Sequence, residues 1–129
     1  MDKRRFIETV GGGISYLTPI GKRHGDTVLR TPKKIKNGNI GINQPVAKAL
    51  KIKTNIKYNE MVVYTKGLKK STVANTERHE PIEKHIFRYG KLKGTPHRKY
   101  QKAHEVALKF EETKVTPKEA LRWYKEHRK

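Results

Sequence analysis

Asn37–Lys53, NGNIGINQPVAKALKIK, is the stretch of sequence that decides the fold. It opens with Asn37-Gly38, the strongest turn signal in the chain, because both residue types tolerate positive φ. The alternation in Ile40-Gly41-Ile42 then places both isoleucines on one face of a strand. Val46 and Leu50 are four residues apart and therefore share one face of a short helix, which can close over that strand.

The same stretch resembles the swapped-hairpin DNA-binding domains of the AbrB, MazE and SpoVT type. In that pattern an Ile-x-Ile strand precedes a short helix with apolar residues four and eight positions after the second Ile, and another apolar residue follows two positions later. Val46, Leu50 and Ile52 occupy those positions, and the resemblance covers residues 31–66. It implies a swapped-hairpin barrel, a dimer, and a basic surface on DNA. The alternative is an ordinary strand, turn and short helix in some other small basic fold.

Outward from this stretch, the first half of the chain predicts strands. Short apolar or β-branched runs at 15–18, 27–29, 40–42 and 61–64 are separated by Gly and Asn turns. We therefore expect an α+β fold with a β-rich N-terminal half followed by about three helices. The predicted organisation is an N-terminal arm at 1–18, a basic β-rich domain at 19–70, a linker at 71–80 and a helical region at 81–129.

Three helices are expected after the linker. The first runs from Pro81 to Tyr89, and Gly90 is placed to end it. The second begins at Thr95-Pro96, an N-cap followed by a first-turn proline, and continues to about Thr113. The third begins with Thr116-Pro117-Lys118-Glu119, which has the pattern of a capping box. We interpret the apolar stripes of these helices as core packing.

Charge is the main signal of function. Thirty-one Lys and Arg oppose 12 Asp and Glu, for a net charge of +19 on 129 residues. Such an excess repels itself in a compact chain and favours a polyanionic partner, of which nucleic acid is the leading candidate. Lys dominates residues 19–75, and Lys neutralises phosphate without the bidentate fork that reads guanine edges. Contacts to the phosphate backbone are therefore expected.

Two surfaces are candidates for those contacts. One is the β-rich half, where the family resemblance implies phosphate contacts near the first strand. The other is the start of the second predicted helix, where free backbone N–H groups favour phosphate. The predicted nucleic-acid-binding residues are Arg30, Lys33, Lys34, Lys36, Lys48, Lys51, Lys53, Lys69, Lys70, Arg98, Lys99 and Lys102.

Catalytic and metal-binding signals are weak in the sequence. His79 with His85, and His97 with His104, lack the i,i+4 spacing that sets two imidazoles on one helix face. We therefore expect mostly exposed histidines, with no metal site, cofactor or catalytic residue. Glu77, Glu80 and Glu83 are interpreted as solubilising a helix. A metal-dependent nuclease is the alternative from the enzyme class.

Localisation signals are also sparse. The chain has no cysteine and no apolar run near the roughly 20 residues that a membrane span requires. Lys3-Arg4-Arg5 is similar to the opening of a twin-arginine export signal, but polar residues interrupt the apolar stretch that should follow. We expect a cytoplasmic protein with no membrane partner, whose first residues form a short arm.

The function predicted from these observations is binding of nucleic acid, with double-stranded DNA favoured over RNA, through phosphate contacts. The family resemblance adds a homodimeric regulator to that prediction. The alternative is a structural component of a ribonucleoprotein or virion, which would contact both packaged nucleic acid and protein neighbours. A regulator should form a defined dimer and bind DNA alone, whereas an assembly component should be poorly ordered until it meets its partners.

Overall fold

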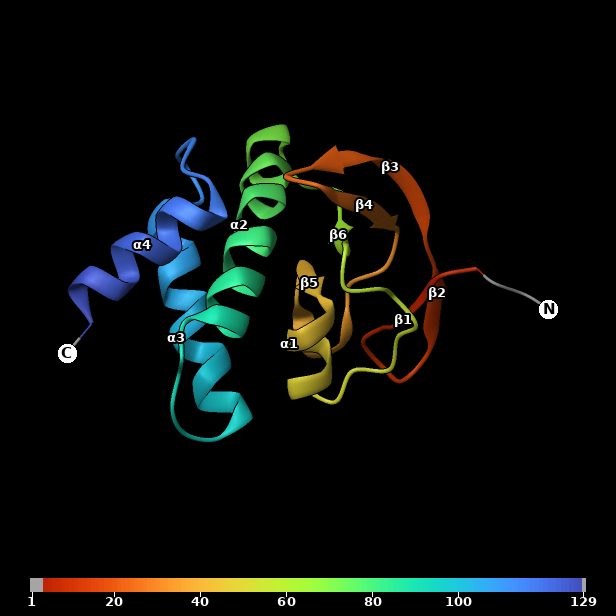
Figure 1. The fold of residues 1–129 in the computed structure, drawn as a ribbon. Coiled ribbons are helices and arrows are strands. Elements are labelled where there is room, and N and C mark those ends of the chain that lie inside the picture. The colour runs from red at the N-terminus through yellow and green to blue at the C-terminus, as the bar shows by residue number, and fades with distance from the viewer. Residues whose placement is uncertain (1–3, 129) are drawn as a thin grey trace.

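The computed structural model describes residues 4–128 as an α+β fold, which confirms the predicted class. A β-rich half and a helical half lie side by side, with α2 between the strands and the two last helices (Figure 1). Among the described residues, no helix has both the length and the apolar character needed to cross a membrane. The strands are β1 (Phe6–Glu8), β2 (Ile14–Tyr16), β3 (Thr18–Arg23), β4 (Asp26–Thr31), β5 (Gly41–Asn43) and β6 (Glu60–Tyr64).

The strands form two open sheets. β1 and β2 make an antiparallel hairpin, and the other four strands are ordered β3-β4-β6-β5. β4 runs parallel to β6, whereas β3 and β5 pair antiparallel to their neighbours. No closed barrel is present within residues 4–128, so the implied swapped-hairpin barrel is not seen in this single chain. A dimer that exchanges hairpins stays a prediction.

Residues 37–53 form a turn, a strand and a short helix in the predicted order, although Ile40 lies outside the strand and borders a polar cavity, whereas Ile42 lies in the core. Asn37 and Gly38 have φ values of 67° and 77° in a single 3-10 turn, η1 (Lys36–Gly38). β5 follows and leads directly into α1 (Gln44–Ala49), whose N-cap is Asn43. The Asn43 side chain accepts a hydrogen bond from the backbone N–H of Val46, which is buried with Ile42 and Ile52. The helix therefore closes over the strand, as the apolar spacing requires.

The predicted N-terminal arm belongs to the folded body. Residues 6–8 form β1 and pair with β2 around the turn at Gly11-Gly12-Gly13. Ile7 and Leu17 lie in the core beneath the four-stranded sheet. Of the twin-arginine-like opening, Lys3 lies outside the described residues, and Phe6 already belongs to a strand.

The helices are α2 (Lys70–Tyr89), α3 (Pro96–Phe110) and α4 (Pro117–His127). Three of their ends are as predicted: Gly90 is the C-cap of α2, Thr95 caps α3, and Thr116 and Glu119 form the capping box of α4. The predicted linker at 71–80 is wrong, because α2 begins at Lys70 and Pro81 lies inside it. Apolar periodicity misses this part of α2 because its buried side chains include the polar residues Thr76, His79 and Glu80.

Two larger apolar cores contact α2, and a third, smaller cluster on β4 and β6 consists of Val28, Met61 and Val63. One is formed by the sheet and α1 and includes Ile7, Leu29 and Val62. The other lies between α2, α3 and α4 and includes Ile82, Ile86, Ala103 and Ala120. Phe87 packs against both cores. α2 is therefore the element on which the two halves of the protein meet.

A buried ion pair also joins α2 to the sheet. Lys84 Nζ on α2 lies 2.6 Å from Asp26 Oδ1 at the start of β4 and donates to the backbone carbonyl of Tyr58 at 2.7 Å. Both charged side chains are 8% exposed. Because each charge is withdrawn from water, each depends on the other for compensation.

Asp26→Asn should therefore destabilise the fold by about 3 kcal/mol, because it leaves the Lys84 ammonium buried beside a neutral partner. Lys84→Met should cost a similar amount by stranding the carboxylate of Asp26. The double variant should cost clearly less than the sum, which urea unfolding of all four proteins in a double-mutant cycle measures. Additive losses would contradict a coupled buried pair.

Candidate functional site

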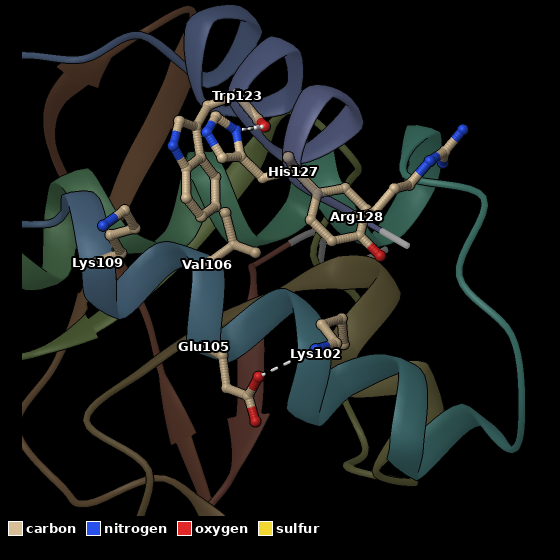
Figure 2. Close-up of a pocket in the computed structure, with 8 residues that line it drawn as sticks. Lys102, Glu105, Val106, Lys109, Trp123, His127 and Arg128 are labelled. Atoms are coloured by element: carbon tan, nitrogen blue, oxygen red, sulfur yellow. Dashed lines mark hydrogen bonds and ion pairs between the residues drawn. The ribbon is translucent and has the colours of Figure 1, made fainter.

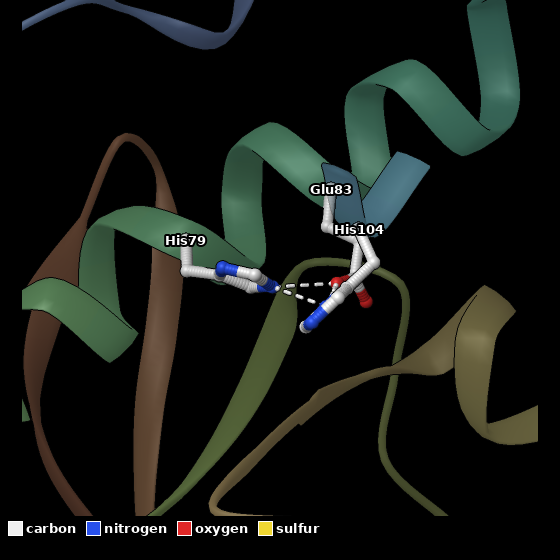
Figure 3. Close-up of side chains that lie close together, drawn as sticks. All are labelled: His79, Glu83 and His104. Atoms are coloured by element: carbon white, nitrogen blue, oxygen red, sulfur yellow. Dashed lines mark hydrogen bonds and ion pairs between the residues drawn. The ribbon is translucent and has the colours of Figure 1, made fainter. Parts of the chain in front are cut away.

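The polar residues of α2 gather in one buried cluster. His79 and Glu83 lie one turn apart on α2, and His104 reaches them from α3 (Figure 3). His79 Nε2 is 2.6 Å from Glu83 Oε2, His104 Nδ1 is 2.9 Å from the same oxygen, and the two nitrogens are 3.1 Å apart. Glu83 is 2% exposed and His79 5% exposed. Three potential donor atoms therefore converge on one point inside the protein.

Outer partners fix the orientation of the cluster. Glu111, which follows α3, lies with Oε2 3.0 Å from His79 Nδ1, so each nitrogen of that imidazole faces a carboxylate. Asn43 Nδ2 donates to Glu83 Oε1 at 3.3 Å and to Glu80 Oε1 at 3.0 Å. The Asn43 side chain therefore caps α1 with its oxygen and holds two carboxylates of α2 with its nitrogen.

The cluster faces a cavity of about 180 Å³ between α2, α3 and the start of β5. Glu80, Tyr100 and Leu108 contribute to its wall, together with Gly41 of β5. A Cβ atom at Gly41 would overlap the Thr76 methyl group and lie 2.8 Å from Glu80 Oε2. The glycine therefore leaves the room that the Glu80 carboxylate occupies.

The protonation of the cluster is strongly perturbed. Burial alone would lower the pKa of His79, but hydrogen bonds to Glu111 and Glu83 and the charge of Glu80 raise that pKa to about 10. Burial, reinforced by repulsion from Glu83, raises the pKa of Glu80 to about 8. For Glu83, burial opposes ionisation, but hydrogen bonds to His104 and His79 outweigh it and lower the pKa.

This cluster is not predicted from the sequence. No pair of histidines considered above has i,i+4 spacing, whereas His79 and Glu83 have that spacing as a histidine and a carboxylate. The predicted exposure of the histidines is wrong for His79, and Glu80 and Glu83 are buried rather than solubilising. The contribution of His104 follows from the packing of α3 on α2, which no local pattern predicts. An imidazole, a carboxylate and a second imidazole are donors that divalent transition ions bind.

A second candidate site lies on the other side of α3. A cavity of about 640 Å³ is bordered by the loop after α2, by α3 and by the end of α4. All of its charged lining residues are basic. We call this set the basic groove: Lys91, Lys93, Arg98, Lys102 and Arg128.

An aromatic cavity continues the basic groove along α3 and α4, since both are lined by Lys102, Tyr124 and Arg128. Figure 2 shows side chains that line the aromatic cavity, with Lys102, Trp123 and His127 labelled. Trp123 and His127 stack there with ring centroids 4.6 Å apart and planes 18° apart. Lys109 Nζ lies 4.9 Å from the centroid of the Trp123 ring. Cations and an aromatic pair therefore share one continuous surface with a single carboxylate, Glu105, which lies 3.4 Å from Lys102 Nζ.

The predicted basic residues are distributed over several surfaces. Arg98 and Lys102 meet in the basic groove. Lys48 and Lys99 line a different groove with Arg88, which brings together one residue from each of the two predicted surfaces. Lys36 is paired with Glu8 at 3.3 Å. The remaining predicted residues lie exposed on β4, on the loops that follow β4 and α1, and at the start of α2: Arg30, Lys33, Lys34, Lys51, Lys53, Lys69 and Lys70.

Comparison with known proteins adds no relative. No family model, curated protein or solved structure matches this chain. The geometry of the two sites is therefore the basis on which a function can be inferred.

The raised pKa of Glu80 predicts a pH-dependent stability. Between about pH 4.5 and pH 8 the folded protein holds a proton that the unfolded chain releases, so stability should fall as pH rises through this window. Glu80→Gln keeps an acceptor for Asn43 but removes the titrating carboxyl group. The slope of the free energy of unfolding against pH should therefore become flatter by up to about 1.4 kcal/mol per pH unit. This comparison is made between about pH 5 and 6.5, below the range in which His79 contributes.

Urea unfolding of chelator-treated protein across that range measures this effect. Glu105→Gln removes an exposed carboxylate from α3 and serves as the control, whose slope should match that of the unmodified protein. Equal slopes for the unmodified and Glu80→Gln proteins would contradict a protonated Glu80.

Proposed function

We propose that the protein binds nucleic acid through phosphate contacts in the basic groove. The observation that carries this proposal is the convergence of five cationic side chains, from the α2–α3 loop, α3 and the end of α4, on one cavity whose charged lining residues are all basic. Like charges gathered in this way repel one another, so an anion in the cavity would relieve a cost that the free protein bears. The net charge of +19 extends the attraction to a polyanion.

The composition of the groove favours contact with the backbone over reading of bases. Three of its five cations are lysines, which neutralise phosphate as mobile point charges. Arg128 already donates through Nη1 to the carbonyl of Gly90 at 2.8 Å, so part of its guanidinium is committed to the fold. We therefore propose binding that depends strongly on salt and little on sequence.

The aromatic extension supports a nucleic acid over a small anion. Trp123 offers a ring beside the groove, on which an unpaired base at a duplex end or in an RNA loop can stack, and such stacking is tolerant of sequence because every base has a π-face. Double-stranded DNA remains the favoured polymer because residues 31–66 resemble swapped-hairpin DNA-binding domains. We also propose that the protein is a homodimer and is located in the cytoplasm. A short duplex compared with an RNA hairpin of equal charge decides between the polymers.

Removal of cations from the groove should weaken binding and reduce its salt dependence. In Arg98→Gln/Lys102→Gln, loss of two phosphate contacts should lower the slope of log K against log salt by about 2. The matched control is Lys22→Gln/Lys66→Gln, which removes the same charge from exposed positions on β3 and after β6. Fluorescence anisotropy with a random duplex over a salt series measures both slopes, and equal losses in the two variants would contradict a localised site.

Trp123 is the only tryptophan in the chain, so its emission reports on the aromatic cavity that adjoins the basic groove. Titration with the same duplex should change this emission saturably, with the midpoint found by anisotropy, because bound nucleic acid displaces water from the cavity beside the ring. Arg98→Gln/Lys102→Gln should shift both midpoints together. Unchanged emission at saturation would place the nucleic acid on another face of the protein.

A further inference from the structure

We propose that His79 Nε2, Glu83 Oε2 and His104 Nδ1 bind one divalent transition-metal ion, whose remaining coordination positions face the cavity between α2, α3 and β5. The site is separate from the basic groove and does not depend on nucleic-acid binding. It joins α2 to α3 at the level of Glu83, where the three side chains point toward one another (Figure 3).

The spacing of the donor atoms fits such an ion. Sides of 2.6, 2.9 and 3.1 Å define a triangle with a circumradius of about 1.7 Å. An ion about 1.2 Å above the plane of this triangle would therefore lie about 2.05 Å from all three atoms, the length of Zn–N and Zn–O bonds. The ligands would occupy one face of the ion and leave the other face open.

Hydrogen bonds join these three atoms when no ion is present, and an ion would take the place of the shared protons. Both imidazole nitrogens face the same Glu83 oxygen and also lie 3.1 Å from each other. If both nitrogens carry protons, both N–H groups can donate to Glu83 Oε2, and if only one does, a lone pair of the other nitrogen faces the carboxylate. A cation at the centre interacts favourably with the lone pairs of all three atoms at once.

The outer partners are those expected around a metal-bound histidine. Glu111 Oε2 lies 3.0 Å from His79 Nδ1, so a proton on that nitrogen would leave the Nε2 lone pair free for the ion. Asn43 donates to Glu83 Oε1, which leaves Oε2 as the coordinating oxygen. The two imidazole rings cross at 62° with centroids 4.7 Å apart, so both can direct a nitrogen to one ion without overlap.

The carboxylates of the pocket could balance the charge of a cation. Glu83 and Glu111 both lie against His79, and an ion that displaced the proton from its Nε2 would be balanced by these two carboxylates. Two nitrogen donors with one carboxylate favour Zn²⁺, Fe²⁺ or Co²⁺ over Mg²⁺ and Ca²⁺, which prefer oxygen donors. The His104 side chain is 38% exposed and marks the path of entry.

The sequence around His79 strengthens the assignment. In the helical pattern His-Glu-x-x-His, the first and last residues bind zinc and the glutamate acts on water bound to the ion. Residues 79–83 read His-Glu-Pro-Ile-Glu, with a glutamate in the position of the second histidine. Glu80 borders the cavity onto which the ion would open, so water on the ion would lie in a space that a second carboxylate lines.

Metal titration of the full chain tests the proposal. Chelator-treated protein is reloaded with Zn²⁺ and measured by native mass spectrometry and calorimetry, and Co²⁺ loading is followed by its visible absorption. We expect one ion per chain and a raised melting temperature. His104→Ala should weaken Zn²⁺ binding at least 100-fold, whereas His97→Ala, an exposed histidine on the same helix, should bind as the unmodified protein does.

Glu111→Gln keeps all three ligands and should weaken binding about 10-fold to 100-fold, since only the orientation of His79 changes. Circular dichroism shows whether His104→Ala is folded. If it is not, Glu111→Gln still tests the site. The proposal is overturned if the reloaded protein holds no ion. It is also overturned if the folded His104→Ala and His97→Ala variants bind Zn²⁺ equally.

Discussion

The structure depends on how the buried carboxylates of α2 are compensated. Glu80 and Glu83 are withdrawn from water in the middle of the helix that joins the two halves of the protein. Carboxylates in such positions are costly unless hydrogen bonds or counter-charges surround them. Asn43 supplies hydrogen bonds from β5, and His79 and His104 supply the remainder from α2 and α3. Their partners therefore fix how the strand and the second helix pack on α2.

This compensation explains several features that look unrelated in the sequence. Asn43 occupies the junction of β5 and α1 because one side chain must cap the helix and donate to two carboxylates. Gly41 lies two residues earlier because any side chain there would take the space of Glu80. The first half of α2 is polar on its buried face because that face lines a polar cavity. The apolar residues Ile82 and Ile86 follow where the helix enters a dry core.

Local signals were sufficient for much of the fold. The Asn37-Gly38 turn, the capping box at Thr116 and the C-cap at Gly90 each depend on residues close in sequence, and all were predicted. The parallel pairing of β4 with β6 and the helical state of residues 71–80 depend on distant contacts, and they were not. The same limit applies to the sites. The spacing of His79 and Glu83 was visible in the sequence, whereas their meeting with His104 requires the packing of α3 on α2.

The two candidate sites use opposite faces of α3. Tyr100 and His104 face the cavity beside β5, whereas Lys102, Val106 and Lys109 face the cavities along α4. An ion at His104 would therefore not touch phosphate held in the basic groove. The ion would instead fix α3 against α2. Because the basic groove is built from α3, the α2–α3 loop and the end of α4, the ion would hold two of these parts in place. The geometry thus favours an ion that organises the helical half, or that serves a small molecule in its own cavity, over one that cleaves nucleic acid bound along α4.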